Sequence, residues 1–199
     1  MKIKENGRSM VEMLGVLAII GILSAGALAG FNKAMFKHKM NQTIVEVSNI
    51  FQRWQELDAQ VNGENLNDAE VTEFVAKRIL DGYYQDLEGV YKLPIGSVSI
   101  QAEVVNGGLV SDIWISFDDT NNVNECITLL SQHWETFLPQ EWFTDNGFIG
   151  IDNPERYELY GWVGNEKKSG MISMDEIIKA CNLCEGSRCD VTFAIRGYL

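Results

Sequence analysis

Four cysteines carry most of the chemistry that the side chains of this sequence offer: Cys126, Cys181, Cys184 and Cys189. Four cysteines allow three disulfide connectivities. Cys184 and Cys189 flank a short loop with a glycine that a disulfide can close, whereas Cys126 and Cys181 lie on two predicted helices. A bridge that closes about 55 residues stabilises a fold by on the order of 4 kcal/mol in the chain-entropy model. We favour Cys126–Cys181 with Cys184–Cys189, and Cys181–Cys184 with Cys126–Cys189 is the main rival.

Zinc binding and redox catalysis are the alternatives for these thiols. Zinc would take Cys181, Cys184 and Cys189, with His133 or Cys126 as the fourth ligand. A redox CxxC motif normally begins a helix, whose N-terminus lowers the thiol pKa, but Cys181-x-x-Cys184 ends a predicted helix. Structural disulfides are therefore the preferred interpretation, and the sequence predicts neither a metal nor a cofactor.

Other residue types that support catalysis are sparse. His38 lies in a basic stretch and His133 lies between Gln and Trp, and neither has a nucleophile close to it in sequence. The sequence has no phosphate-binding loop and no GxSxG or HExxH motif. Oxygen-bearing side chains alternate over residues 118–124, but Val123 stands where a calcium loop needs glycine. Turn and cap chemistry explains these residues, and we expect no catalytic site and no enzyme activity.

The cysteines need a folded domain to bring them together, and the sequence after residue 63 predicts an α+β domain. Asn106-Gly107-Gly108 between two alternating runs is a strong hairpin signal. Ser173 and Glu176 form a capping box that opens a helix. The expected helices are 67–80, 123–134 and 174–181, and the expected strands are 97–105, 109–117, 157–163 and 190–196.

The composition is that of a globular protein, because 46% of the 199 residues are hydrophobic and 22% are charged. The formal net charge is −12. Such a charge disfavours polyanionic partners, so we expect the folded domain alone to bind no nucleic acid.

The N-terminal part has a different pattern, because residues 13–31 contain no charged side chain. As a helix this run is about 28 Å long, close to the hydrocarbon thickness of a bilayer. Lys2, Lys4 and Arg8 precede it and favour a cytoplasmic N-terminus, although lysines also follow it. A buried core helix is the alternative. Glu12 at the edge of the run costs about 2.5–3.5 kcal/mol in lipid, so it needs a partner or a place among the headgroups.

The helical pattern continues beyond the apolar run. Apolar residues recur at steps of three and four, with polar residues between them: Met40, Ile44, Val47, Phe51 and Trp54. We expect one helix of about fifty residues that ends at residues 62–63, with an apolar half and an amphipathic half. This amphipathic half should pack on an antiparallel sheet. Two helices hinged near residue 32 are the alternative.

The segment that begins at Gly7 and includes the apolar run resembles the N-terminus of type IV prepilins and pseudopilins. In that family a short basic leader ends in Gly, the chain is cut directly after it, and a Glu stands at the fifth mature position. The resemblance implies that Gly7 ends the leader, that Arg8 is the first mature residue and that Glu12 is the fifth. The family usually has Phe or another apolar residue where this chain has Arg8. The implied parts are a leader at 1–7, a transmembrane and assembly helix at 8–33, its amphipathic continuation at 34–62 and an extracytoplasmic headpiece at 63–199.

The resemblance implies a structural subunit of a type IV pilus or a related filament. The chain would be inserted in the inner membrane with a cytoplasmic N-terminus and cleaved by a prepilin peptidase. Inner-membrane assembly machinery would then polymerise it with copies of itself and other pilins, into an extracellular pilus or a periplasmic pseudopilus. Both compartments are oxidising and favour disulfides, and a long-range bridge near the C-terminus also resembles the one in pilins.

Within such a filament, two features of the helix would act at the contact between subunits. Glu12 would face the terminal amine of Arg8 in a neighbour, and a buried pair of this kind sets register. Gly26 and Gly30 have the GxxxG spacing that lets helices approach closely.

A membrane-anchored periplasmic binding or catalytic domain that does not polymerise is the alternative function. Such a domain needs neither Gly7 nor Glu12. A tether rich in Gly, Ser or Pro would normally separate it from its anchor, but the three prolines of this chain all lie far downstream. The sequence therefore favours the filament subunit.

Overall fold

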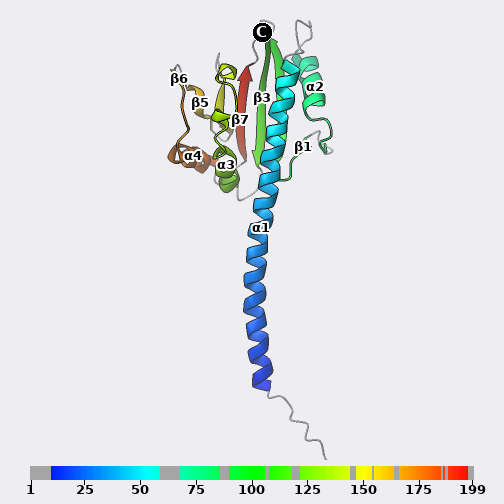
Figure 1. The fold of residues 1–199 in the computed structure, drawn as a ribbon, viewed down its shortest axis with the longest axis vertical. Helices are drawn as coiled ribbons and strands as arrows, with labels where there is room; N and C mark the ends of the chain where they lie inside the picture. The colour runs from blue at the N-terminus through cyan, green and yellow to red at the C-terminus, as the bar shows by residue number, and fades with distance from the viewer. Residues whose placement is uncertain are drawn as a thin grey trace, which may run out of the picture. The chain divides into compact units, whose positions relative to one another are not determined.

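The computed structural model describes residues 10–58, 68–85, 90–105, 108–117, 122–143, 147–153, 155–163, 166–184, 186 and 188–196. The chain divides into two compact units, Met1–Lys39 and Met40–Leu199. Helix α1 contributes residues to both units, and all of the described strands belong to the second (Figure 1).

Helix α1 runs from Met10 to Asp58 and comprises 49 residues. It is rich in Ala, Leu and Met, which lose little side-chain entropy in a helix. The helix is continuous through Asn32, so the alternative of two helices hinged there is wrong. The predicted helix end at residues 62–63 lies outside the described residues.

The second unit contains a seven-stranded sheet with the order β1-β2-β3-β7-β4-β5-β6. All neighbouring strands are antiparallel. The α+β class that the sequence predicts is therefore confirmed. The strands are β1 Tyr91–Lys92, β2 Ser97–Val105, β3 Gly108–Phe117, β4 Phe148–Asn153, β5 Tyr157–Val163, β6 Glu166–Lys168 and β7 Cys189–Arg196.

Strand β7 comes last in the chain but lies in the middle of the sheet, between β3 and β4. Phe193 on β7 is paired with Ile113 on one side and with Ile149 on the other. Five consecutive residues of this strand, 191–195, are buried. Both faces of the sheet are therefore covered around β7, which makes this strand the centre of the hydrophobic core.

Residues 40–58 of α1 pack on one face of the sheet. The ring of Phe51 lies 4.9 Å from that of Phe193, and the indole nitrogen of Trp54 donates a hydrogen bond of 2.8 Å to the Ser111 hydroxyl on β3. Both side chains belong to the apolar stripe that the helical period predicts. The amphipathic half of the helix is thus part of the core of the second unit.

Three further α-helices complete the second unit: α2 (Asp68–Ile79), α3 (Asn122–Leu130) and α4 (Met174–Cys181). Helix α2 is fixed to β2 because the Thr72 hydroxyl bonds both the carbonyl oxygen and the amide nitrogen of Ala102, at 2.8 and 3.0 Å. Short 3-10 helices follow α3 and α4: η1 (Trp134–Thr136), η2 (Gln140–Trp142) and η3 (Asn182–Cys184).

The predicted helix at 123–134 is shorter than expected. His133 adopts a left-handed backbone conformation with φ 53°, which interrupts the helix. The indole nitrogen of Trp134 donates to the Leu129 carbonyl at 2.7 Å, so the chain turns back on the end of α3 instead of continuing it.

Strands β1, β4 and β6 were not expected from the sequence. The turn between β1 and β2 depends on Gly96, which has φ 78°. A Cβ at this position would also clash with the Ser116 carbonyl oxygen and the Phe117 ring. This glycine is therefore required twice over, by its conformation and by the close approach of β3.

Candidate assembly surface and disulfide centre

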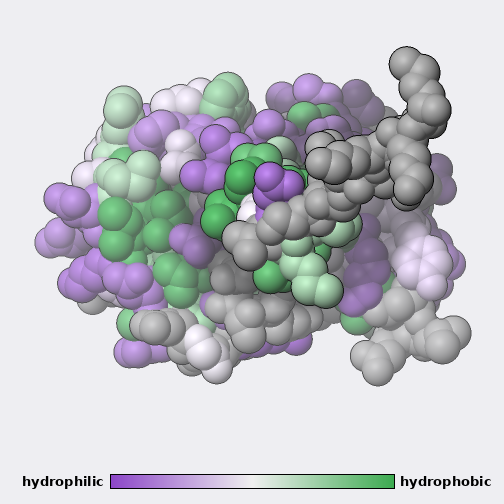
Figure 2. Space-filling model, turned by 90° about the horizontal axis from the view of Figure 1, so that it is seen from below, coloured by the Kyte–Doolittle hydropathy of each residue, from purple (hydrophilic) through white to green (hydrophobic). Residues whose placement is uncertain are grey.

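The first half of α1 exposes a long series of apolar side chains. Their exposed fractions run from 37% at Met35 to 84% at Met10. Large exposed apolar patches mark contact with lipid or with another protein. We call these exposed side chains the apolar surface of α1: Met10, Met13, Leu14, Val16, Leu17, Ile19, Ile20, Ile22, Leu23, Leu28, Phe31 and Met35. Figure 2 shows the molecule from below, where hydrophobic residues lie at the surface among hydrophilic ones.

Helix α1 is long and apolar enough to cross a membrane. None of its most apolar stretch is buried against the rest of the described chain. The alternative of a buried core helix is therefore wrong for this stretch. An exposed apolar surface of this kind is typical of contact with lipid or with another chain, because water does not solvate it favourably.

Glu12 lies in the first turn of α1, and its side chain is exposed. The first amide groups of a helix lack intrahelical partners, and the helix dipole is positive at this end. Acidic residues are favoured in the first turn of a helix for this reason. Gly7 and Arg8, the predicted processing residues, lie outside the described residues.

Gly26 and Gly30 lie on α1 with open space around them. A Cβ built at either position meets no described atom within 4 Å, and the same holds for Gly15 and Gly21. Glycine inside a helix costs about 1 kcal/mol relative to alanine. Since no contact within the described chain requires glycine there, the slim surface at 26–30 is available to another helix or to lipid.

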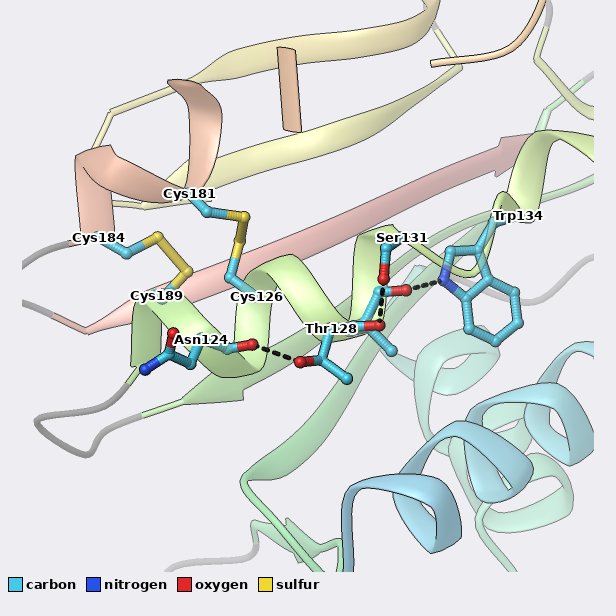
Figure 3. The surroundings of a disulfide bond; sticks show 9 residues. Asn124, Cys126, Thr128, Ser131, Trp134, Cys181, Cys184 and Cys189 are labelled. Atoms are coloured by element: carbon cyan, nitrogen blue, oxygen red, sulfur yellow. Dashed lines mark hydrogen bonds between the residues drawn. A yellow bond between two sulfur atoms is a disulfide. The ribbon is translucent and has the colours of Figure 1, made fainter. Parts of the chain in front are cut away.

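The four cysteines form two disulfides, Cys126–Cys181 and Cys184–Cys189 (Figure 3). Their Cα atoms lie 5.7 and 5.0 Å apart, within the range that disulfides require. The pairs are those that the sequence analysis favours, and the rival connectivity is not the one in the structure. Cys126–Cys181 joins α3 to the end of α4, and Cys184–Cys189 joins η3 to the first residue of β7.

The two bridges lie next to each other. The sulfur atoms of Cys126, Cys184 and Cys189 all lie within 4.8 Å of one another, and all four cysteines are 0% exposed. Zinc binds thiolates, so this group is a zinc site only after reduction of the bridges. The Cys181-x-x-Cys184 pair ends α4 rather than beginning it, which does not provide the helix N-terminus that activates a redox thiol.

His133 is not part of the group that the cysteine sulfurs form. His133 Nδ1 lies 3.0 Å from Glu135 Oε1, and the same oxygen accepts a hydrogen bond of 3.1 Å from the Ile172 amide. This link ties η1 to the segment before α4 and gives His133 a structural role. Asp118 and Thr120 of the weighed calcium loop lie outside the described residues, whereas Asn122 and Asn124 lie on α3.

A groove of about 380 Å³ lies between the second half of α1 and the segment that contains η1 and η2. Two of the aromatic residues that line it, Trp134 and Trp142, are buried. The groove itself was missed, because it depends on how residues 132–142 fold over the helix. Its lining comprises Ile44, Ser48, Phe51, Gln52, Gln55, Gln132, Trp134, Phe137, Leu138, Pro139 and Trp142.

The fold and these features define a class: an α+β protein whose N-terminal helix is long and apolar enough to cross a membrane and whose sheet unit holds two buried disulfides. This architecture is compatible with a pilin-like fold. No family model, no curated protein and no solved structure matches the chain.

Proposed function

We propose that this chain is a structural subunit of a type IV pilus or a related filament, cleaved after Gly7 and polymerised through α1. The observation that carries the proposal is the continuity of α1 from Met10 to Asp58. One half of this helix exposes apolar side chains, whereas the other half belongs to the core of the sheet unit. One part of the helix is therefore available for contact with lipid or other chains, and the other part packs in the sheet unit.

The glycines of α1 support assembly rather than simple anchoring. A lipid anchor needs only apolar side chains, and alanine would stabilise it better than glycine by about 1 kcal/mol per position. At Gly26 and Gly30 the helix lacks side chains although no contact in the described chain requires glycine there. The GxxxG spacing is explained if a second helix packs closely against these two residues.

Glu12 supports the same proposal. After cleavage the α-amino group of Arg8 becomes a cation close to the start of α1. In a bundle of staggered helices, Glu12 of one subunit would face this amine of the next. The pair would fix the register between subunits, because a register that separates the two charges would leave each of them uncompensated.

The proposal includes a route and partners. The precursor would lie in the inner membrane with its N-terminus in the cytoplasm, and the prepilin peptidase and the inner-membrane assembly machinery would act on it there. The product would be an extracellular pilus or a periplasmic pseudopilus of this chain with other pilins. The net charge of −12 disfavours nucleic acid as a ligand of the headpiece.

Replacement of Gly7 by Ala tests the processing step. A Cβ at the residue before the scissile bond would obstruct the close approach of the backbone to a protease cleft. We expect full-length Gly7→Ala protein to remain in the membrane fraction without filaments, while the wild type is shortened. Gly15→Ala is the matched control, because it makes the same change on α1 away from the cleavage point. Normal maturation of Gly7→Ala would argue against the pilin assignment.

An anchored binding domain that does not polymerise is the second candidate, and the groove favours it. Its volume of about 380 Å³ lies within the range of small-ligand pockets, and apolar and aromatic side chains line most of it. In that case the wild type would keep residues 1–7 and stay in the membrane fraction, whatever residue stands at position 7.

A further inference from the structure

One sulfur atom of the first disulfide lies close to both sulfur atoms of the second. Three of the four sulfur atoms, those of Cys126, Cys184 and Cys189, lie within 4.8 Å of one another. Cys126 belongs to one bridge, whereas Cys184 and Cys189 form the other. Cys181 is bonded to Cys126 but lies outside this group of three. Cys126 is thus the residue of the first bridge whose sulfur lies near both sulfurs of the second.

Well-anchored elements hold these sulfurs in place. Cys189 is the first residue of β7, the strand between β3 and β4, and is paired with Phe117 at the end of β3. Cys126 lies on α3, and Cys184 lies on η3 directly after α4. Helix α4 begins with a complete capping box at Ser173. The three sulfurs that lie close together (Figure 3) thus belong to residues of α3, η3 and β7.

All four cysteines are 0% exposed. Thiol–disulfide exchange needs direct approach of an attacking thiolate to a disulfide sulfur. A partner protein or a small thiol from solution has no such access in the folded unit. Within the described residues, the nucleophile that can approach a disulfide sulfur directly is therefore a cysteine thiolate that is itself buried beside the bridge.

We propose that the sulfur cluster is an internal thiol–disulfide exchange site, with Cys126 as its nucleophile and the Cys184–Cys189 bridge as its substrate. The site acts on chains in which the Cys126–Cys181 bridge is open. The Cys126 thiolate attacks the sulfur of Cys184 or Cys189 and forms a new S–S bond. The Cys184–Cys189 bond breaks, and its electron pair leaves on the other sulfur, which becomes the new thiolate. The number of disulfides is unchanged, so the step needs no oxidant or reductant.

This exchange gives the folded unit a way to correct its own bridges. A chain that has closed one wrong bridge among the three clustered sulfurs can return to Cys184–Cys189 without unfolding. That return leaves Cys126 and Cys181 as free thiols, and a disulfide oxidant such as glutathione disulfide can join them when the unit opens enough to admit it. The inference is independent of filament assembly, since it concerns only the sheet unit.

The test compares Cys181→Ser with Cys126→Ser. In Cys181→Ser the Cys126 thiol faces both sulfurs of the remaining bridge, so exchange spreads the free thiol over residues 126, 184 and 189. In Cys126→Ser the free thiol is at Cys181, outside the cluster, and should stay there. The purified variants are equilibrated, quenched in acid, alkylated under denaturing conditions and mapped without reduction. We expect bridges from Cys126 to Cys184 and to Cys189 in the first variant and only Cys184–Cys189 in the second.

The rate adds a second readout. Only the thiolate attacks, so redistribution in Cys181→Ser should speed up about tenfold per pH unit below the thiol pKa. Finding only Cys184–Cys189 with a free Cys126 in a folded Cys181→Ser variant would overturn the proposal. Equal scrambling in both variants would overturn it too, because it would indicate exchange in unfolded chains.

Limited reduction of the wild type keeps the test valid if Cys181→Ser does not fold. Brief treatment with a dithiol reductant in mild denaturant, followed by removal of both and acid quenching after refolding, yields one-bridge species. We expect Cys126–Cys184 or Cys126–Cys189 among those that regain the near-ultraviolet circular dichroism of the native unit. Their absence, with Cys126–Cys181 or Cys184–Cys189 as the sole bridges, would contradict exchange.

Discussion

Glu12 is the residue on which the assembly hypothesis depends most. It is the acidic residue of the first turn of α1, and its side chain is exposed. The helix dipole explains part of its position within one chain. The apolar residues that follow it explain why a charge here needs a compensating partner once lipid or other helices cover α1. In the sequence this residue stands out because it is charged at the edge of an apolar run, but its assembly role is implied only by the resemblance to prepilins.

Glu12→Gln tests whether the charge of Glu12 has a partner in the filament. The change is nearly isosteric, so insertion and cleavage after Gly7 should persist and the sheet unit should fold normally. Loss of one member of a buried charge pair costs about 3–5 kcal/mol because the other charge is left uncompensated. We therefore expect mature protein to accumulate in the membrane while filaments in the sheared fraction fall sharply. Glu56→Gln, an exposed change on the second half of α1, should leave filament yield unchanged. Wild-type yield from Glu12→Gln would show that its charge sets no register.

Gly26 tests whether helices approach each other at the slim surface of α1. In Gly26→Leu the new Cβ meets no described atom within 4 Å, and helix propensity improves by about 1 kcal/mol. The subunit itself should therefore be at least as stable, whereas filament yield should fall because a bulky side chain separates the helices. Gly15→Leu makes the same change on the helix away from the GxxxG pair. Equal filament yields from wild type and Gly26→Leu would contradict close packing of helices at Gly26.

Secondary structure follows from sequence where the local signals are strong. The alternation around residues 106–108 predicts β2 and β3, and the capping box at Ser173 predicts the start of α4. Strand β4 was missed, because its sequence is short and irregular and bulges interrupt its pairing at Ile149 and Gly150. Its conformation is also set by pairing with β7, which is distant from it in sequence. Long-range pairing of this kind has no local signature.

The capping box of α4 gives a prediction at the level of one element. The Ser173 hydroxyl accepts from the Glu176 amide, and the Glu176 carboxylate accepts from the Ser173 amide. Ser173→Ala should lower the free energy of unfolding by about 0.5–2 kcal/mol in denaturant titrations at neutral pH. Ser169→Ala removes an exposed hydroxyl just before the helix and should change it far less. Equal effects of the two changes would contradict a role of the cap in stability.

The pH dependence of this cap has a defined sign. Hydrogen bonds from Lys168 and from Ser173 lower the pKa of Glu176 from 4.5 to about 2. A carboxyl whose folded pKa is lowered contributes stability that is full above its unfolded pKa and is lost as the pH falls towards its folded pKa. The stability difference between wild type and Glu176→Gln should therefore shrink between pH 4.5 and about 2. Burial raises the pKa of Asp58 and acts in the opposite sense, so only the comparison of the two proteins isolates Glu176. A difference that stays constant over this interval would contradict the assignment.

The whole molecule combines features that are visible in the sequence with features that are not. The apolar run and the amphipathic stripe predict α1, since each is a periodic pattern along one helix. The disulfide pairs followed from loop length and predicted helices. The groove beside Trp134 and the close approach of three sulfurs could not be predicted from the sequence, because they depend on how α3, η1 and β7 pack in three dimensions.

The central claim is that α1 assembles a processed subunit into an exported filament. Intact-mass measurement of the protein in two fractions, the membrane and the material sheared from cells, tests it most directly. We predict that the sheared fraction contains a chain that begins at Arg8 and carries two disulfides, and that the membrane fraction contains this form together with the precursor that begins at Met1. A protein that keeps residues 1–7 in every fraction and never leaves the membrane would contradict the claim.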